Sequence, residues 1–326
     1  MKHTLVSVCC LLVCLLALAG NPERANRRDM TLILAGDVML GRGVAQALDG
    51  DWEDAFAGVR SWLAGDAPRA GRGSTLTFAN LESPLTSRSH MGEGYDLRAP
   101  PGAATALRAG GFDAVSLANN HAMDAGEAGL RETVRALRAA GIEPWLNPAA
   151  HAAGRETIYA AHPRSPHRGL AFDDSKRPLD LGAAASAVST AAADDDVVVV
   201  SIHWGGEYQA TPSSRQQEIA RVLAAAGADV IVGHGPHVLQ RVEWIGQTLV
   251  AYSLGNFLFD QPYPADCSWG VILRVTLMDG QARSVEALPT VVERGRVRPA
   301  DPETAGKILR RLRIDPAKLP GDGQGA

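Results

Sequence analysis

Short apolar runs that each end in a polar cluster constrain the fold of this chain more than any other feature. They lie at Thr31–Ala35, Thr75–Ala79, Ala114–Ala118, Val197–Ile202 and Asp229–Val232, and their length and flanking residues predict buried strands. Segments with helical spacing of apolar residues separate them, at Val44–Leu63, Ala103–Ala109, Gly126–Ala140 and Ser213–Ala226. This alternation predicts an α/β layered fold with both faces of the sheet covered.

The rest of the chain gives weaker signals. Further strands are expected near Ile142–Leu146, Thr157–Ala160 and Gly169–Phe172, and antiparallel strands at Val238–Trp244, Thr248–Ser253, Gly270–Met278 and Ser284–Val292. The triplet Asp194–Asp196 is interpreted as a solvated turn. No repeat is visible. We therefore predict one domain over residues 30–294, followed by a C-terminal helix and flexible tail over residues 295–326.

The N-terminus predicts export. Lys2 and His3 precede an apolar run from Leu5 to Ala19, which ends in small residues, the pattern of a signal peptide over residues 1–20. The alternative is an uncleaved anchor helix, but the run is shorter than the roughly 20 residues that span a bilayer. A periplasmic or extracellular location is expected, with membrane anchoring through this segment as the second possibility.

The cysteine count and the net charge narrow the classes of protein to which this chain can belong. Three of the four cysteines lie within the predicted leader, so the mature chain would keep only Cys267 and could form no internal disulfide. The net charge of −4 gives no support for nucleic-acid binding.

The polar clusters that follow the strands contain the side chains expected to carry the chemistry. In α/β sheets, ligands bind beyond the carboxyl ends of strands, where loop residues converge. Imidazole, carboxylate and amide oxygen together suit Zn, Mn or Fe. We therefore predict a site for one or two divalent ions from Asp37, Glu82, Asn120, His121, His203, His234 and His237.

Each cluster also has a simpler interpretation. Asp37 after Gly36 is commonly an Asx turn, and residues 119–121 could cap a loop. His203 taken alone is more often a hydrogen-bonded core histidine. The loop Gly233–His237 is more specific, because Gly and Pro set a tight turn that can aim two imidazoles inward. The joint placement of these clusters after strands favours the metal site.

The segments Leu34–Arg42, Ala79–Pro84, Leu117–Gly126, Ser201–Tyr208, Val232–Val238 and Tyr252–Phe259 occur in the order, and with the residues, of a known family. This set resembles the CapA family, the bacterial capsule-synthesis and poly-γ-glutamate-associated family of the metallophosphatase superfamily. The resemblance runs from about Thr31 to Asp260. It implies a four-layer α/β/β/α metallophosphatase-like sandwich with metal ligands at strand ends.

The resemblance also implies roles for individual residues. Asp37 would be the first acidic ligand, with a catalytic role, and Glu82 a bridging carboxylate. Asn120, His203 and His234 would complete one ion, while His237 would join Asp37 on the other. His121 would act over the substrate as general acid or electrostatic stabiliser. Substrate contacts would come from Arg42, Asn119 and Glu207. Apart from the resemblance, the segment Ser253–Phe259 is interpreted as packing under the site, with Asn256 orienting a loop.

Two departures from the wider superfamily pattern concern the second ion. That pattern opens with Asp-x-His, but Met39 stands at the third position here, and a thioether is a poor ligand for hard divalent ions. It closes with Gly-His-x-His, whereas the loop that ends at His237 has one extra residue. The second metal position is therefore weak, differently built or empty, and phosphomonoesterase activity does not follow from the resemblance.

Two functions are compatible with these features. The first is an exported metal-dependent hydrolase that acts on an anionic envelope polymer, such as poly-γ-glutamate, or on a small substrate. The second is a non-catalytic factor in polymer assembly or transport, with a structural or vestigial metal site and with membrane synthase subunits as partners.

Overall fold

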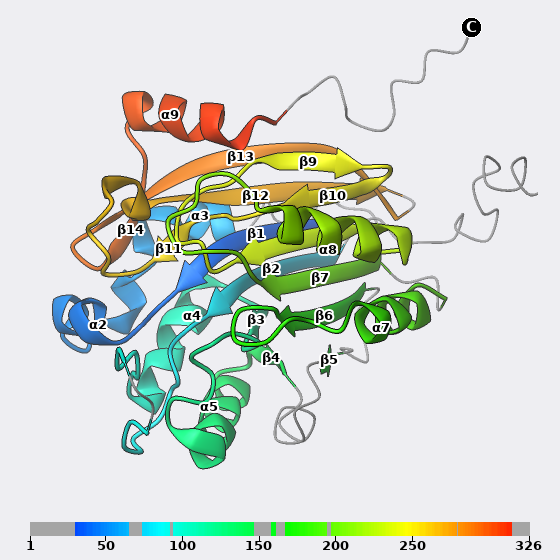
Figure 1. The fold of residues 1–326 in the computed structure, drawn as a ribbon. Helices are drawn as coiled ribbons and strands as arrows, with labels where there is room; N and C mark the ends of the chain where they lie inside the picture. The colour runs from blue at the N-terminus through cyan, green and yellow to red at the C-terminus, as the bar shows by residue number, and fades with distance from the viewer. Residues whose placement is uncertain are drawn as a thin grey trace, which may run out of the picture.

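Two β-sheets packed face to face form the centre of the protein (Figure 1). The computed structural model describes residues 30–64, 74–91, 94–146, 158–160, 167–193, 197–278 and 280–314. The predicted leader at residues 1–20, the triplet Asp194–Asp196 and the tail from Pro316 lie outside these ranges. Within them, no helix has the length and apolar character needed to cross a membrane.

The first sheet combines a parallel half with an antiparallel half. Its order is β14-β13-β12-β1-β2-β3-β4, and β11 pairs with β1 off this path. The four strands β1 to β4 run parallel, while β12, β13 and β14 continue the sheet in antiparallel pairs. The bounds are β1 Met30–Val38, β2 Ser74–Leu81, β3 Ala114–Ser116, β4 Glu143–Trp145, β11 Asn256–Leu258, β12 Trp269–Met278, β13 Gln281–Glu293 and β14 Arg296–Pro299.

The second sheet has the order β5-β6-β7-β8-β10-β9. Its four central strands are parallel and its two edge strands are antiparallel to their neighbours. The bounds are β5 Ile158–Ala160, β6 His167–Asp173, β7 Val197–His203, β8 Val230–His234, β9 Val242–Ile245 and β10 Thr248–Ala251. The carboxyl ends of β7 and β8 therefore point the same way.

Alternation along β7 shows how the layers form. Val197 and Val199 belong to the core between the two sheets, whereas Val198, Val200 and Ile202 belong to a second core under the helices. A strand buried on both faces explains the uninterrupted β-branched run in the sequence. Helices α7 (Leu181–Ala193) and α8 (Ser214–Ala225) cover this outer face, and α4 (Ala104–Gly110) and α5 (Gly126–Ala139) lie against the first sheet (Figure 1). The predicted four-layer α/β/β/α sandwich is confirmed.

The helix predicted over Val44–Leu63 is wrong in its extent. Helix α2 covers only Arg42–Leu48, and two short 3-10 turns, Trp52–Asp54 and Ala57–Val59, precede the single turn α3, Arg60–Leu63. The chain breaks at Asp49 and Gly50, which have φ values of 46° and 90°. Left-handed backbone ends a helix, so the apolar spacing alone overstated its length.

Two later expectations also need correction. The strand predicted from Val238 begins only at Val242, and β10 pairs in parallel with β8 as well as antiparallel with β9. Past residue 294, β14 extends the first sheet and helix α9 (Pro302–Leu312) packs near β12 and β13. The domain boundary after residue 294 stays a prediction.

Gly169 in β6 sets the contact between the two sheets beside Trp145 of β4. A Cβ placed on Gly169 would lie 2.2 Å from the indole of Trp145, which is buried and packs against the Phe78 ring with 4.3 Å between ring centroids. Gly169→Ala should therefore lower the free energy of unfolding by about 1–3 kcal/mol through overpacking. Denaturant unfolding measures this. Gly102→Ala, where a Cβ meets nothing within 4 Å, is the control, and equal stability of the two variants would contradict the packing argument.

Candidate metal centre

Parallel pairing in both sheets brings the polar strand ends to one edge. In the first sheet Asp37 is in register with Asn80 of β2 and Asn256 of β11, and Glu82 directly follows β2. In the second sheet His203 and His234 are register partners as the last residues of β7 and β8. The two sheets thus each deliver acidic or imidazole groups to the same place, as the sequence predicted.

The carboxylates of Asp37 and Glu82 lie among three imidazoles. Asp37 Oδ1 is 3.2 Å from His234 Nδ1, and Asp37 Oδ2 is 3.6 Å from His237 Nδ1. Glu82 Oε1 is 3.3 Å from His203 Nε2. All five side chains are buried. Ligand atoms of Asp37, Glu82 and His237 lie within 4.8 Å of one another, so these three residues could hold a metal ion.

Several potential ligand atoms of the predicted site residues are buried without a hydrogen-bond partner. They are Glu82 Oε2, Asn120 Oδ1, His203 Nδ1 and both ring nitrogens of His234. His234 Nδ1 lies near Asp37 Oδ1, but the two atoms are not in hydrogen-bonding geometry. A buried polar atom left unpaired destabilises a fold by about 1–3 kcal/mol. Glu82 Oε2 and the ring nitrogens of His234 are unpaired atoms of ligating type beside His203 and Asp37, and they fit a bound divalent cation.

Burial and neighbouring charge act against each other on the ionisable groups. Burial alone would raise the pKa of Asp37, but the neighbouring imidazole of His234, with those of His237 and His203, holds it at about 2. Burial alone would lower the pKa of His203, but Asp173 and Glu82 raise it to about 10. Without a metal, His203 therefore carries a proton, and its charge offsets part of the negative charge of the carboxylates. A divalent cation can replace that proton beside the same carboxylates.

Asn80 and Asn119 form a relay that fixes both carboxylates. Asn119 Nδ2 donates to the Leu81 carbonyl at 2.9 Å, which settles the orientation of its amide, and also to Asn80 Oδ1 at 3.0 Å. Asn80 Nδ2 must then face the acids, and it donates to Asp37 Oδ1 at 3.0 Å and to Glu82 Oε1 at 3.1 Å. One backbone carbonyl thus determines where two candidate ligands point.

A second relay orients His237. Asn256 Nδ2 donates to the Cys267 carbonyl at 3.0 Å, so its Oδ1 is the acceptor 2.9 Å from His237 Nδ1. The proton of His237 therefore sits on Nδ1, and Nε2 keeps its lone pair. Such a second partner is what fixes the tautomer of a ligating histidine.

The loop between β8 and His237 requires glycine at position 235. Gly235 has φ 103°, and a Cβ there would lie 2.9 Å from the His203 ring. Its N–H donates to Asp37 Oδ2 at 3.2 Å. His237 itself has φ 58°. The Gly and Pro residues of this loop therefore let the backbone approach Asp37 while both imidazoles remain in the cluster.

Met39 does not face the cluster as a ligand would. It is fully buried, and its Sδ accepts a hydrogen bond from the Gly41 N–H at 3.0 Å. The Met39 sulfur thus accepts a hydrogen bond within its own loop instead of facing the cluster.

His121 stands beside the cluster as part of a His–Asp pair. Its Nδ1 lies 2.8 Å from Asp124 Oδ2, and its backbone N–H donates to Asn119 Oδ1 at 3.1 Å. Lys176 Nζ donates to the Asn120 carbonyl. The relay through Asn119 therefore connects His121 to the carboxylates.

The three predicted substrate contacts lie in different settings. Asn119 is buried and its amide is used in the relay. Arg42 forms an ion pair with Asp260 and lies 5.4 Å from the Tyr95 ring centroid. Glu207 is exposed on the loop after β7. Their roles stay predictions, although a positioning role suits the contacts of Asn119 better.

Comparison with known proteins gives the family. The family described as bacterial capsule synthesis protein PGA_cap matches residues 31–145 and 145–261, more than half of the chain. The chain belongs to this family.

Several relatives cover most of the chain. The capsule biosynthesis protein CapA of Bacillus anthracis is 27% identical over 93% of this chain and 77% of its own. The PGA biosynthesis protein CapA of Bacillus subtilis (strain 168) is 30% identical over 80% of this chain and 73% of its own. A hypothetical protein from Thermus thermophilus, known from a crystal structure, is 16% identical with a TM-score of 0.47, over 80% of this chain and 98% of that one.

Three residues in and around the candidate metal centre were not singled out from the sequence. Asn80 directly follows the predicted strand Thr75–Ala79 and lies within the observed β2. Asp173 ends β6 with Oδ1 at 3.6 Å from His203 Nδ1, and Asp124 pairs with His121. Asn80 and Asp124 lie within motifs of the family resemblance. Asp173 gave no signal beyond its place after an apolar strand.

Asn256→Ala should weaken metal binding by about 10–100-fold, because a supporting partner of a ligating histidine is lost. Asn256→Asp keeps an acceptor oxygen and should therefore lose less metal affinity than Asn256→Ala. Competition against a chromophoric chelator, with Zn²⁺ or Mn²⁺, measures the affinity. Gln247→Ala, which removes an exposed amide, is the control and should bind metal as tightly as the unmodified protein. Equal affinity in Asn256→Ala would contradict the role of Asn256 in orienting His237.

Proposed function

We propose that this protein is an exported metal-dependent hydrolase that acts on an anionic envelope polymer of the poly-γ-glutamate type. The observation that carries the proposal is the set of buried, unpaired ligand atoms around Asp37 and Glu82. Relatives whose names refer to capsule and PGA biosynthesis support the polymer class. The apolar leader at residues 1–20 supports export.

The residues that would hold metal are Asp37, Glu82, Asn120, His203, His234 and His237. Their mixture of carboxylate, amide and imidazole groups suits Zn, Mn or Fe. When bound, such an ion supplies Lewis-acid chemistry, polarising the scissile group and making water a better nucleophile near neutral pH. The relay through Asn80 keeps both carboxylates turned toward the imidazoles, and Asn256 engages Nδ1 of His237, which leaves Nε2 as the nitrogen available to a ligand.

The side chain of His121 would donate a proton to the leaving group of the hydrolysis reaction. Asp124 engages its Nδ1, so Nε2 is the nitrogen left to give a proton to the leaving group. Arg42 and Glu207 would contact the substrate, with the Arg42 guanidinium already held in place by Asp260. Separate residues would then hold the metal, contact the substrate and donate the proton.

One observation favours a second function, a non-catalytic factor in polymer assembly that works with membrane synthase subunits. Met39 directs its sulfur to the Gly41 N–H instead of supplying a ligand. A single ion held by the cluster would then have a structural role, without a neighbouring ion to share the reaction.

Metal analysis with activity assays separates the two functions. Purified protein should contain one or two divalent ions, and chelation should abolish hydrolysis of γ-glutamyl substrates. His234→Ala should remove most of the metal and reduce kcat/KM by at least about 10³-fold, the scale of losing the assembled site. The matched control is His90→Ala, beside Asp96 and outside the cluster. Polymer binding without turnover would support the assembly function, and activity unchanged in His234→Ala would exclude the hydrolase.

Removing the proton donor should separate catalysis from metal binding. His121→Gln should lower kcat by about 10²–10⁴-fold, as expected for loss of a general acid, with unchanged metal content. Asp124→Asn should also lower kcat, because Nδ1 of His121 loses its carboxylate partner. Glu127→Gln, which removes a carboxylate from an exposed ion pair with Arg131, should change neither. Full activity in His121→Gln would contradict the assigned role.

A further inference from the structure

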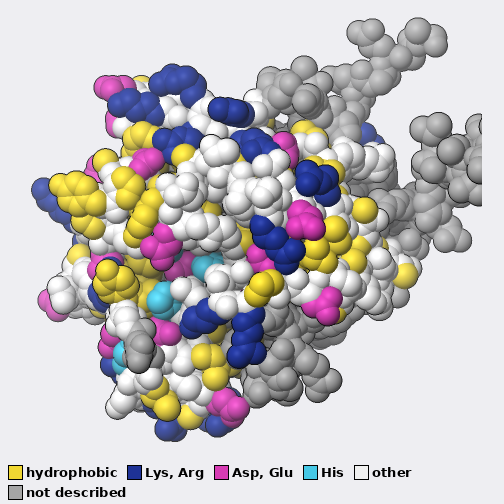
Figure 2. Space-filling model, viewed as in Figure 1, with side chains coloured by type: hydrophobic (Ala, Val, Ile, Leu, Met, Phe, Trp, Pro, Cys, Tyr) yellow, Lys and Arg dark blue, Asp and Glu magenta, His cyan; other side chains and the backbone are white. Residues whose placement is uncertain are grey.

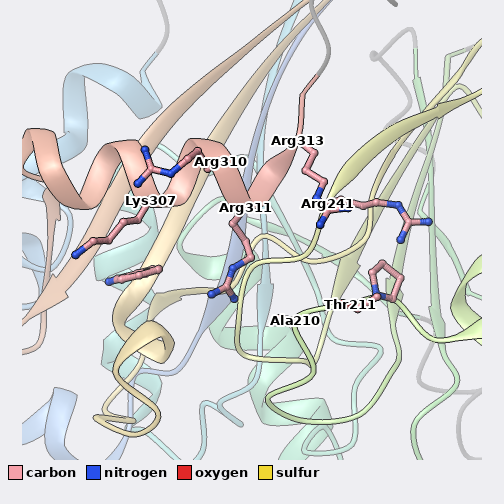
Figure 3. Close-up of a pocket in the computed structure, with 9 residues that line it drawn as sticks. Ala210, Thr211, Arg241, Lys307, Arg310, Arg311 and Arg313 are labelled. Atoms are coloured by element: carbon pink, nitrogen blue, oxygen red, sulfur yellow. The ribbon is translucent and has the colours of Figure 1, made fainter.

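A basic pocket lies away from the metal cluster, between α9 and the loop that follows β7 (Figure 3). Its volume is about 510 Å³, within the range of about 300–1,000 Å³ typical of ligand sites. It is lined by Ala210, Thr211, Pro212, Arg241, Trp269, Lys307, Arg310, Arg311 and Arg313. Five of these residues are cationic in a protein whose net charge is −4.

Only some of the cations are neutralised. Arg241 pairs with Glu243, Lys307 with Glu303 and Arg311 with Asp266, at N···O distances of 2.9, 2.7 and 3.0 Å. For Arg310 and Arg313, both exposed, no acidic partner is found among the residues that the structure describes. The pocket therefore keeps an excess of positive charge, and guanidinium groups bind carboxylates in bidentate pairs.

The arrangement suits an extended anion with apolar spacers. The cationic side chains are spread along α9 and the facing segment instead of converging on one point (Figure 3). Trp269 and Pro212 add apolar surface between them. A single phosphate would meet only one or two of these groups. A chain that alternates carboxylates with methylene groups can meet several.

Two loops connect this pocket with the metal cluster. The loop after β7 begins at His203, and its Tyr208 N–H donates to the Pro236 carbonyl at 2.8 Å, beside His237. It then continues to Ala210 in the pocket wall. The second loop carries Asp266, which pairs with Arg311, and Cys267, whose carbonyl accepts from Asn256. In Figure 2 the basic side chains lie at the top, over α9, and histidine and acidic groups lie below them on the same face.

We propose that this pocket is a secondary binding site for a polycarboxylate segment, which holds the polymer while another part of it reaches the metal cluster. The inference rests on the proposed function for its choice of polymer. Binding at the pocket needs neither metal nor turnover. The two ideas can therefore fail separately.

The test measures binding of a fluorescently labelled oligo-γ-glutamate to the full chain by anisotropy, with chelator present. Arg310→Gln/Arg313→Gln should bind at least about tenfold more weakly, because two charge-assisted contacts are lost. The matched control is Arg135→Gln/Arg138→Gln on α5, which removes the same charge from positions outside the pocket and should bind as the unmodified protein does. Affinity should also fall as salt rises. Melting temperatures verify that both variants are folded.

Three results would overturn the proposal. The first is no binding of the oligomer by the unmodified protein, and the second is an equal loss in both double variants. The third is a loss confined to inorganic phosphate or to vesicles of anionic lipid, which would assign the pocket to those ligands. If the oligomer binds as expected but is never hydrolysed, the secondary site stands and the hydrolase fails.

Discussion

Two carboxylates buried at the meeting point of the two sheets are the constraint on which the rest of the site depends. Asp37 and Glu82 are almost fully removed from water, where an uncompensated charge is strongly unfavourable. The imidazoles of His203, His234 and His237 lie beside them, the proton held by His203 offsets part of the negative charge, and a divalent cation can offset more. Because one sheet carries both acids and the other delivers all three imidazoles, neither half of the site is stable without the other.

The orientation of this cluster comes from the backbone. The carbonyls of Leu81 and Cys267 each fix one amide side chain, and those amides pass the orientation to Asp37, Glu82 and His237. A backbone carbonyl in an ordered segment cannot rotate to accept a hydrogen bond from a different donor. The geometry is therefore set before any ion binds, which is the preorganisation that a metal site requires.

The site and the basic pocket share structural supports. The segment from His203 to Pro212 and the segment from Asn256 to Trp269 each begin at the metal cluster and end in the pocket wall. A long anionic chain could thus be held at one place and processed at another. This division suits a polymer better than a small substrate, because remote contacts can supply binding energy that the reacting group does not.

The sequence by itself determined which residues stand at the strand ends. Apolar runs mark buried strands, and parallel strands bring their carboxyl ends to one edge, so Asp37, His203 and His234 were found before any coordinates. Their joint motifs also gave the family. Only the tertiary structure decided what depends on register and on close approach: the break after Leu48, the Asn80 relay, the use of Met39 in its own loop, and the pocket between α9 and Arg241. Most of these features join residues far apart in the chain, and local periodicity carries no record of such contacts.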